Sequence, residues 1–444
     1  MTGTKIGMVS LGCSKNRVDS EEILGELTAR GAVTVNDPRE AEVIIVNTCG
    51  FIESAKTDSL DTIFEMARYK SEGSCRLLAV CGCLSERYYD ELNEELPEAD
   101  LIWGVKDHRG LAEAIEQRIT GEISSPACAS QRVLTTPPFR AYLRIADGCD
   151  NRCTYCAIPL IRGGRVSYPM EQLVKEAEDL ADRGVTELTV IAQDTSAYGV
   201  DLYGEPKLAE LLKRLALIEK LHWIRLLYTY PNTVDEKLID TIKAEPKICS
   251  YIDMPIQHID PDLLRAMNRH GSAEHIREIT DYIRAADPDF ILRTTAIVGF
   301  PGETEEQFGE LMDFLAEHPY DRLGAFTYSP EDGTPAAAME GQIPEKVKRK
   351  RLDRLMRQQR NISFAANKAR IGRVYEVLVD EVRDGVAYCR SYAEAAEVDG
   401  FIKVKLAECE LPAAERGGYT GKYRFVEITG AEAYDLHGEW WPRR

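Results

Sequence analysis

The sequence predicts an α/β multidomain protein, because the pattern of apolar residues changes twice along its 444 residues. A first segment alternates apolar runs with helical patterns three times, and a second segment repeats that alternation six times. From about Gly372 onward the runs are short and β-branched, with little helical signal. Strands that alternate with helices indicate parallel sheets covered by helices. We therefore expect an N-terminal open parallel α/β sheet domain, a central partial (β/α)6 barrel and a C-terminal small β-barrel of roughly 70 residues.

The domain bounds are placed where these patterns change. The stretch "GEISSPACASQRVLTTPP" lacks periodicity and ends in two prolines, which is typical of a linker. A chain of this length can hold two or three domains, each with its own core. We place the sheet domain at 1–120, the linker at 121–138, the (β/α) barrel at 139–370 and the small β-barrel at 371–444.

The first segment contains three pairs of strand and helix. "KIGMVSLGC" precedes "DSEEILGELTAR", whose helix we expect to be capped by Asp19 or Ser20. "AEVIIVNTC" and "CRLLAVCGC" each precede a further helical pattern. The three apolar runs end at Cys13, Cys49 and Cys83. Because ligands of open parallel sheets collect beyond the carboxyl ends of the strands, we expect these three thiols to lie close together.

The second segment contains six apolar runs with helical patterns such as "EQLVKEAEDLADRG" between them. Six strand and helix units indicate an incomplete barrel, with its chemistry at the carboxyl ends of the strands. The expected strands are 141–149, 187–194, 223–230, 251–258, 290–300 and 322–329.

The net charge of −19 is spread along the chain, with −9 over 1–138, −6 over 139–370 and −4 over 371–444. A protein that binds nucleic acid mainly through phosphates usually shows a basic surface, and none of these segments is net basic. "KVKRKRLDRLMRQQR", residues 346–360, carries eight positive side chains and one negative. We interpret it as the solvated face of a long helix, with a ribosome or RNA contact as the alternative.

The cysteine content favours a reducing compartment. The sequence shows no charged segment followed by an apolar leader and no long uncharged run, so neither secretion nor membrane spanning is expected. Twelve cysteines in a reducing compartment indicate metal or catalytic roles rather than disulfides. We therefore expect a cytoplasmic protein.

Cys149, Cys153 and Cys156 form a C-x3-C-x2-C array just after the first expected barrel strand. Three thiolates this close can hold three irons of a 4Fe-4S cluster, and the absence of a fourth nearby cysteine leaves one iron open. A tetrahedral zinc site usually needs four ligands. Three buried, inert thiols have no reason to gather in one loop flanked by glycine. The array therefore favours an iron-sulfur cluster over these two alternatives.

This spacing, with Tyr155 before the last cysteine, resembles the radical S-adenosylmethionine (SAM) superfamily. In that superfamily the open iron binds SAM, and an electron from the cluster cleaves SAM to a 5'-deoxyadenosyl radical. The three-part layout is similar to that of the methylthiotransferases, whose last domain is a TRAM-like β-barrel. The resemblance implies a second 4Fe-4S cluster, held by Cys13, Cys49 and Cys83 at "LGC", "NTC" and "CGC".

The other cysteines are interpreted as structural. Cys81 lies two residues before Cys83, inside the apolar run that precedes the strand end, and is interpreted as a structural residue. The rest share no spacing, which is typical of buried small hydrophobic residues. They are Cys75, Cys128, Cys249, Cys389 and Cys409.

Four motifs separate two branches of the methylthiotransferases. One branch modifies an adenosine of tRNA, and the other modifies an aspartate of small-subunit ribosomal protein S twelve. "GCSKN", "QDTSAYG", "MPIQHID" and "YSPEDGTPAA" are similar to the ribosomal-protein branch. The tRNA branch has "GCQMN", "QNVNSYG" and "LPVQSGS" at the first three. The resemblance implies that the adenosyl radical takes a hydrogen from the β-carbon of the aspartate, which then receives a methylthio group.

Candidate SAM contacts follow from the same resemblance. Gln193 and Asp194 end the second barrel strand, where the superfamily offers polar groups to the methionine part of SAM, and Arg293 lies on the fifth strand. The alternative is that they are ordinary polar residues of the rim or cap the loops there. No motif identifies catalytic residues that hold the substrate aspartate.

Three functions are compared. The first is an aspartate methylthiotransferase acting on ribosomal protein S twelve, free or within the small subunit, with an electron donor such as flavodoxin or ferredoxin. The second is a tRNA adenosine methylthiotransferase, which an acidic β-barrel suits poorly. The third is a non-enzymatic iron-sulfur or RNA-binding protein, which predicts no SAM cleavage. Membrane partners are not expected.

Overall fold

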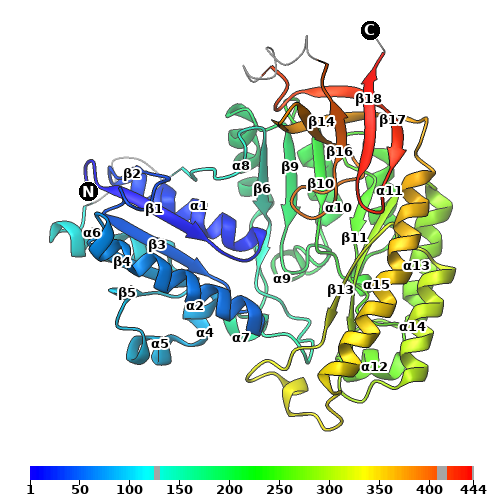
Figure 1. The fold of residues 1–444 in the computed structure, drawn as a ribbon, viewed down its shortest axis with the longest axis horizontal. Coiled ribbons are helices and arrows are strands. Elements are labelled where there is room, and N and C mark those ends of the chain that lie inside the picture. Colours follow the sequence, from blue (N-terminus) through cyan, green and yellow to red (C-terminus); the bar gives the residue numbers. More distant parts are fainter. Residues whose placement is uncertain (125–130, 408–417, 443–444) are drawn as a thin grey trace. The chain divides into compact units, whose positions relative to one another are not determined.

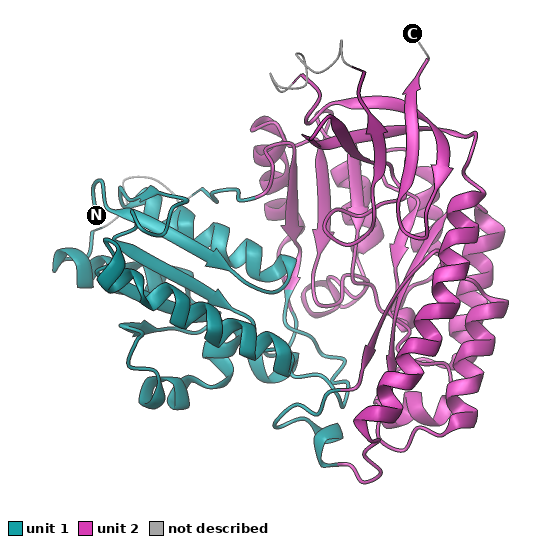
Figure 2. Cartoon of the chain, viewed as in Figure 1, with its two compact units in different colours: residues 1–135, 147–165, 329–338 teal, residues 136–146, 166–328, 339–444 magenta. Residues whose placement is uncertain are grey.

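The computed structural model of the chain divides into two compact units (Figures 1 and 2). The loop that carries Cys149, Cys153 and Cys156 belongs to the same unit as the N-terminal sheet. The domain bounds expected from the sequence stay a prediction. Unit 1 comprises 1–135, 147–165 and 329–338, and unit 2 comprises 136–146, 166–328 and 339–444. The structure describes residues 1–124, 131–407 and 418–442, so part of the expected linker lies outside the described residues.

Unit 1 is built on a five-stranded parallel sheet in the order β2-β1-β3-β4-β5. The two central strands, β3 and β4, are buried along their whole length. Alternate residues of β3 and β4 enter two different apolar clusters, because successive side chains of a strand point to opposite faces. Helices α1 and α6 complete one cluster, and α2 and α5 complete the other (Figure 1). The predicted open parallel α/β domain is confirmed.

The elements of unit 1 have the following bounds. The strands are β1 (Lys5–Ser10), β2 (Val33–Thr34), β3 (Val43–Thr48), β4 (Leu77–Gly82) and β5 (Leu101–Ile102). The helices are α1 (Ser14–Ala29), α2 (Glu53–Ala67), α3 (Tyr69–Glu72), α4 (Cys83–Arg87), α5 (Tyr89–Glu95), α6 (His108–Thr120), α7 (Ile158–Ile161) and the 3-10 turn η2 (Pro335–Ala338).

The expected start of the first helix is wrong. Helix α1 begins at Ser14, directly after Cys13, and neither Asp19 nor Ser20 caps it. Its first turns are buried although they are polar, because their side chains have hydrogen-bond partners inside the unit. Asn16 donates to the backbone oxygens of Leu11 (3.1 Å) and Thr48 (2.8 Å). The start of α1 therefore lacks the apolar periodicity from which a helix start is predicted, because polar contacts bury these residues instead.

Unit 2 begins with six parallel strands that occur in chain order. They form two three-stranded sheets, β6-β9-β10 and β11-β12-β13, joined by a bridge between Ile224 and Ile248. The covering helices are amphipathic; in α10 the buried side chains are Leu208, Leu211, Leu212 and Leu215. The predicted partial (β/α)6 barrel is confirmed.

The strands of this barrel are β6 (Arg140–Arg144), β9 (Glu187–Ile191), β10 (Trp223–Leu226), β11 (Tyr251–Asp253), β12 (Ile291–Val298) and β13 (Arg322–Thr327). The helices are α8 (Met170–Asp182), α9 (Val200–Tyr203), α10 (Leu208–Ala216), α11 (Glu236–Ala244), α12 (Pro261–Ala266), α13 (Ala273–Ala286), α14 (Glu305–Glu317) and α15 (Glu345–Lys368), with a 3-10 turn η1 (Pro231–Thr233). Two short strands are β7 (Ala146–Asp147) and β8 (Val166–Ser167).

The last part of unit 2 is a closed five-stranded barrel in the order β14-β15-β16-β18-β17, which confirms the predicted small β-barrel. Its interior is filled by alternating side chains of the strands. The strand β18, "LHGEWW", has glycine and charge between its apolar residues, and the sequence did not indicate it. The strands are β14 (Val374–Arg383), β15 (Val386–Arg390), β16 (Ile402–Lys405), β17 (Tyr423–Ala431) and β18 (Leu436–Trp441).

A buried ion cluster joins the β-barrel to the (β/α) barrel within unit 2. The guanidinium of Arg390 on β15 lies 2.6 Å from one carboxylate oxygen of Glu187 on β9 and 2.9 Å from the other. Arg225 on β10 also donates to Glu187, at 3.2 Å. Asp380 on β14 accepts from Arg390 at 2.5 Å. The side chains of Glu187, Arg225 and Arg390 are fully buried, so each charge depends on its partners.

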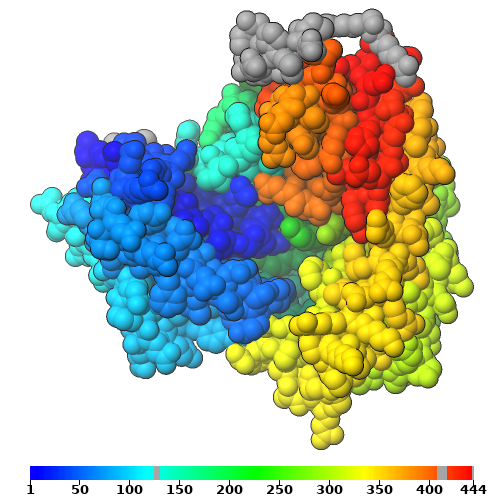
Figure 3. Space-filling view, viewed as in Figure 1, coloured from blue at the N-terminus to red at the C-terminus, as the bar shows by residue number. Residues whose placement is uncertain are grey.

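The basic segment forms the N-terminal two thirds of helix α15, which is drawn yellow to orange in Figures 1 and 3. Most of its cations are exposed, as expected for a solvated face. Lys348 and Arg351 are buried instead. Lys348 donates to the backbone oxygen of Tyr328 at 2.7 Å, and Arg351 donates to a carboxylate oxygen of Glu303 at 2.5 Å. These two cations therefore hold the helix against the barrel.

Among the helices that the structure describes, none combines the length and the apolar character needed to cross a membrane.

Candidate metal centre

The structure brings the three N-terminal cysteines together at the carboxyl edge of the unit 1 sheet. Cys49 directly follows β3, Cys83 opens α4 directly after β4, and Cys13 stands between β1 and α1. Burial raises the pKa of both the Cys49 and the Cys83 thiol, that of Cys83 to about 12, and the nearby Cys13 raises both further. Cys13 therefore lies within electrostatic reach of the other two thiols.

Two glycines give the cysteines their positions. Gly12 has a φ of +87°, and a Cβ there would lie 2.9 Å from the Cβ and 3.0 Å from the Sγ of Cys49. Gly82 has a φ of +102°, and a Cβ there would lie 2.3 Å from the Oδ1 of Asn47. Both positions need glycine, since other residues rarely adopt such φ values and their side chains would collide. The glycines of "LGC" and "CGC" thus allow the backbone next to Cys13 and Cys83 to pack closely against Cys49 and Asn47.

Cys81 and Cys83 lie in different surroundings, although one residue separates them. Cys81 is packed with Ile6 and Ala79 in the apolar cluster between the sheet and the helices α1 and α6. Cys83 lies in a separate small cluster with Val105, Ala157 and Ile161. The interpretation of Cys81 as a structural residue agrees with this packing, and burial raises the pKa of its thiol.

The loop of the second cysteine triplet is compact and packs within unit 1. The backbone N–H of Cys156 donates to the oxygen of Cys153 (3.0 Å), and the N–H of Cys149 donates to the oxygen of Gly163 (3.1 Å). Cys153 is buried, and the other two cysteines are half-buried. Asn151 donates from its side chain to the Sγ of Cys149 at 3.5 Å. The three thiols therefore share one short, internally bonded loop.

The segment 329–338 braces this loop from outside the linear motif. The N–H of Ala336 donates to the oxygen of Thr154, between two of the cysteines, at 2.9 Å. Glu331 is buried, and its carboxylate forms ion pairs with Arg87 at 3.0 Å and Lys56 at 3.4 Å, both residues of the sheet domain. The motif "YSPEDGTPAA" thus ties the cysteine loop to the N-terminal sheet through side chains that no spacing rule would pair.

Arg162 is a residue of the site that sequence reasoning missed. It follows α7, six positions after Cys156, and its side chain is buried. Its Nη2 lies 2.6 Å from Asp19 Oδ2, 2.8 Å from Asn16 Oδ1 and 3.6 Å from Cys83 Sγ. Asn16 belongs to "GCSKN", so that motif held a signal, but nothing in the sequence pairs it with a residue 146 positions away.

Asp19, Glu22 and His108 also cluster, with oxygen and nitrogen atoms within 4.8 Å of one another. His108 Nδ1 lies 2.9 Å from Glu22 and its Nε2 lies 3.5 Å from Asp19. Asp19 also pairs with the Arg162 guanidinium at 2.6 Å, so its carboxylate is shared between this cluster and Arg162. These contacts form a continuous polar chain from Arg162, which lies beside Cys83, through Asp19 to His108 at the start of α6.

The predicted SAM contacts lie in unit 2. Asp194, which follows β9, is buried and accepts from the hydroxyl of Ser196 (2.8 Å) and the N–H of Ala197 (3.2 Å). Arg293 on β12 pairs with Asp253 of β11 at 2.6 Å. These contacts match the alternative role of loop capping and rim structure. A contact of Gln193, Asp194 or Arg293 with SAM stays a prediction.

The other cysteines that the structure describes agree with a structural interpretation. Cys75, Cys249 and Cys389 are buried. Cys128 and Cys409 lie outside the described residues.

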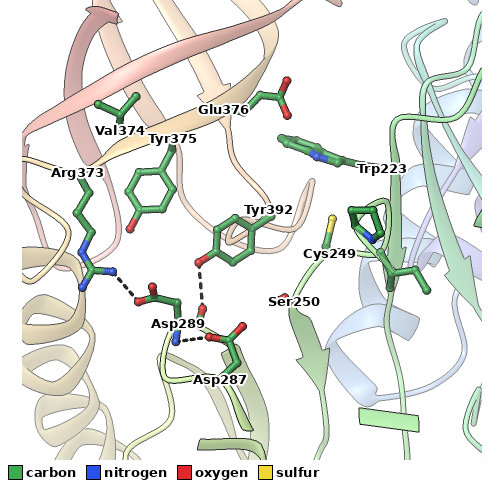
Figure 4. Close-up of a pocket in the computed structure, with 12 residues that line it drawn as sticks. Trp223, Cys249, Ser250, Asp287, Asp289, Arg373, Val374, Tyr375, Glu376 and Tyr392 are labelled. Atoms are coloured by element: carbon green, nitrogen blue, oxygen red, sulfur yellow. Dashed lines mark hydrogen bonds and ion pairs between the residues drawn. The ribbon is translucent and has the colours of Figure 1, made fainter. Parts of the chain in front are cut away.

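Unit 2 contains a cavity of about 530 Å³, and Figure 4 shows the residues that line it. Trp223 opens β10, and Asp289 lies two residues before the start of β12, so the cavity lies at the amino ends of these strands. Two interactions of Asp289 border the cavity. Its carboxylate forms an ion pair with Arg373 (2.5 Å), and its backbone oxygen accepts from the Tyr392 hydroxyl (3.0 Å). Because barrels of this kind carry their chemistry at the carboxyl ends, this cavity is not the candidate active site.

The donor set of unit 1 fits two iron-sulfur clusters. Each triplet supplies three thiols, which can hold three irons of a 4Fe-4S cluster and leave the fourth iron open to a small molecule. Zinc would prefer four protein ligands. The close approach of Gly12 to Cys49 and the hydrogen bonds of the loop at Cys149 fix the backbone next to these cysteines.

Three known protein families together match nearly the whole chain. Residues 143–315 match the radical SAM superfamily, residues 5–104 match a family described as uncharacterized protein family UPF0004, and residues 371–440 match the TRAM domain. The chain is 46% identical to a protein of Desulforamulus reducens over 98% of this chain and 99% of the relative. It is 47% identical to a protein of Heliobacterium modesticaldum over 98% of this chain and 95% of the relative. Both are named ribosomal protein uS12 methylthiotransferase RimO.

Solved structures with the same fold are distant in sequence. The radical SAM methyltransferase TsrM from Kitasatospora setae, solved with cobalamin and a [4Fe-4S] cluster, superposes with a TM-score of 0.52 at 14% identity, over 90% of this chain and 87% of that one. The cobalamin-dependent radical SAM enzyme OxsB has a TM-score of 0.52 at 13% identity, over 80% of this chain and 56% of that one. They show the radical SAM fold, and the full-length relatives show more: the chain belongs to the RimO family of ribosomal protein uS12 methylthiotransferases.

Proposed function

We propose that this chain transfers a methylthio group to the β-carbon of an aspartate in ribosomal protein uS12. The observation that carries the proposal is the identity of 46% with a named uS12 methylthiotransferase over 98% of the chain. The packing of both cysteine triplets in one unit supports it, because such an enzyme needs two metal sites. The tRNA alternative has no such support, since the relatives named above are ribosomal-protein enzymes.

We assign the six cysteines to the two clusters of a SAM-dependent methylthiotransferase. Cys149, Cys153 and Cys156 hold the cluster that binds SAM, and Cys13, Cys49 and Cys83 hold an auxiliary cluster. When bound, the first cluster supplies the electron that cleaves SAM and thereby generates the radical that activates the aspartate. Support for the assignment comes from the three-thiol donor sets and from the close approach of Gly12, the neighbour of Cys13, to the side chain of Cys49.

The protein's own residues orient these groups and exclude water from them. Val105, Ala157 and Ile161 surround Cys83 with apolar side chains, which keeps bulk solvent from its sulfur. Asn16 accepts from the thiol of Cys83 at 3.2 Å while the thiol is protonated. The sulfur that becomes a ligand is therefore oriented before the metal binds, by a side chain fixed to the ends of two strands.

The partners of the reaction follow from its chemistry. We propose uS12 as the substrate, either free or within the small ribosomal subunit, and an electron donor such as flavodoxin or ferredoxin as the reductant. The net charge of −4 over 371–444 suits a basic ribosomal protein better than a tRNA backbone. A cytoplasmic location fits thiols that must stay reduced and a substrate on the ribosome.

Deletion of the gene tests the substrate directly. We expect one aspartate of uS12 to carry a methylthio increment in the parent strain and to lack it in the deletion strain, as measured by mass spectrometry of ribosomal proteins. A plasmid copy should restore the increment. An identical uS12 mass in both strains would contradict the proposal, and loss of methylthio-adenosine from tRNA would favour the alternative branch.

Two neighbouring substitutions separate SAM binding from loop structure. We expect Gln193→Ala to weaken SAM binding about tenfold or more, because a hydrogen bond to a charged group is lost. We expect Asp194→Ala to destabilise the protein by about 1–3 kcal/mol, because the Ser196 hydroxyl and the Ala197 N–H lose their acceptor. Calorimetric titration with SAM and thermal unfolding measure the two effects. An unchanged SAM affinity in Gln193→Ala would remove this residue from the SAM site.

A further inference from the structure

Arg162 lies between the two cysteine sites of unit 1. Its backbone closes α7, which directly follows the loop of Cys149, Cys153 and Cys156. Its guanidinium reaches the N-terminal domain, where Nη2 approaches Cys83 Sγ to 3.6 Å. Its other terminal nitrogen, Nη1, stays with Asp147 at 3.1 Å, just before the cysteine loop. One side chain therefore contacts a thiol of the first triplet and the start of the loop that carries the second.

We propose that Arg162 is a positioning residue for the auxiliary cluster: it donates a charge-assisted hydrogen bond to the Cys83 sulfur and raises the reduction potential of that cluster. The inference rests on the cysteine assignment proposed above. Hydrogen bonds to cluster sulfurs and nearby positive charge are among the factors that set such potentials. Because Arg162 is buried, water does not compete for its N–H groups. Asp19 and Asp147 offset part of its charge, so its effect on the sulfur is carried mainly by the hydrogen bond.

The surroundings hold the guanidinium in this orientation. Asp19 accepts from Nη2 at 2.6 Å, and Asn16 Oδ1 accepts from the same nitrogen at 2.8 Å. Asn16 is itself fixed by donating to the backbone oxygens of Leu11 and Thr48 at the ends of β1 and β3. These contacts hold the guanidinium beside the sulfur, in a framework made of the strand ends that also carry Cys13 and Cys49. Because Nη2 carries two protons, its contact with Cys83 at 3.6 Å shares a proton with one of the two shorter hydrogen bonds.

The change at Cys83 on metal binding strengthens this contact. As a thiol, Cys83 donates to Asn16 Oδ1 at 3.2 Å. As a thiolate ligand it has no proton to donate, so its remaining polar neighbour among these contacts is the Arg162 donor. A hydrogen bond from a cation to a thiolate is stronger than one to a neutral thiol. Arg162 therefore favours the ligand form of Cys83 and withdraws charge from its sulfur.

A purely structural role for Arg162 predicts a different outcome. An arginine that only pairs with Asp19 and Asp147 would change stability when replaced but would leave the potential of a nearby cluster as it was. Arg30 provides the matched comparison within the described part of unit 1. It is equally buried, directly follows α1, and pairs with three carboxylates, those of Glu26 (3.1 Å), Glu113 (3.1 Å) and Glu116 (3.3 Å).

The test isolates the auxiliary cluster in the full-length chain. Cys149, Cys153 and Cys156 are all replaced by alanine, and the reconstituted protein is compared with and without Arg162→Gln, Arg162→Lys or Arg30→Gln. Iron and sulfide content are measured first, and the midpoint potential is then obtained by redox titration followed by electron paramagnetic resonance. We expect Arg162→Gln to shift the potential to more negative values and to change the spectrum. Arg162→Lys should shift it less, and Arg30→Gln should not shift it.

The outcomes separate the two proposals. If the background with Arg162 intact holds no cluster, the cysteine assignment is wrong. If that cluster forms and Arg162→Gln leaves its potential and spectrum unchanged, the role of Arg162 is wrong. Should circular dichroism show that Arg162→Gln does not fold, Arg162→Lys decides, and an unchanged potential and spectrum in this variant contradict the inference.

Discussion

Replacing Cys149, Cys153 and Cys156 together by alanine is expected to abolish SAM cleavage by the reduced, reconstituted protein. Without three thiols in this loop the SAM-binding cluster has no protein ligands, and the iron content should fall from about eight to about four per chain. Detection of 5'-deoxyadenosine by liquid chromatography measures the activity. Replacing Cys13, Cys49 and Cys83 should lower iron by the same amount, keep SAM cleavage and abolish methylthio transfer.

Cys81→Ala is the matched control for both triplets. Its side chain lies in the apolar cluster of the sheet, away from the surroundings of Cys83, so full iron content and SAM cleavage are expected. If Cys81→Ala removed as much iron as Cys83→Ala, the assignment of Cys83 rather than Cys81 as a ligand of the auxiliary cluster would be contradicted. Formation of 5'-deoxyadenosine without the three loop cysteines would contradict the account of the first cluster.

Replacing Glu187 by alanine is expected to destabilise unit 2 by about 3–5 kcal/mol, the cost of leaving a buried charge without its partner. Both Arg390 and Arg225 donate to this carboxylate, and all three side chains are fully buried. Chemical denaturation measures the loss. Glu171→Gln, which removes an exposed pair with Arg214, is the control and should leave the unfolding transition where it was. A loss below about 1 kcal/mol for Glu187→Ala would contradict the role of the cluster.

The same carboxylate predicts a pH dependence that needs no substitution. Burial alone would raise the pKa of Glu187, but the attraction of Arg390 and then Arg225 outweighs burial and lowers it to about 2. Glu394, which pairs with Arg370 and Arg322, has a pKa lowered to about 2 in the same way. A lowered pKa in the folded state stabilises the protein above the unfolded value of about 4.3, and this stability is lost as the pH falls toward about 2. Thermal unfolding between pH 6 and pH 3 should show the decline.

The parts of the fold that depend on local pattern are predictable from the sequence. Strands β3 and β4 are continuous apolar runs, because both of their faces are buried, and the cysteines that follow them lie at the sheet edge that the parallel topology brings together. The six barrel strands are also largely apolar, although polar residues such as Arg225 and Arg293 interrupt some of them. Their order in the sheet follows from the rule that consecutive strand and helix units lie side by side.

The parts that depend on pairing between distant residues are not. Arg390 and Glu187 are 203 positions apart, and Arg162 and Asn16 are 146 positions apart, so no local pattern joins them. The early start of α1 was missed for a related reason: its buried residue Asn16 is polar and is satisfied by backbone oxygens of other strands. Buried polar contacts remove the apolar signal that sequence reasoning uses.

The central claim is that this chain places a methylthio group on an aspartate of uS12. The most direct measurement supplies the reconstituted protein with a reductant, small ribosomal subunits from the deletion strain and SAM whose methyl group carries deuterium. Mass spectrometry should then find one aspartate of uS12 with a deuterated methylthio group, and none when Cys13, Cys49 and Cys83 are replaced. An unmodified uS12, with SAM cleavage intact, would contradict the account.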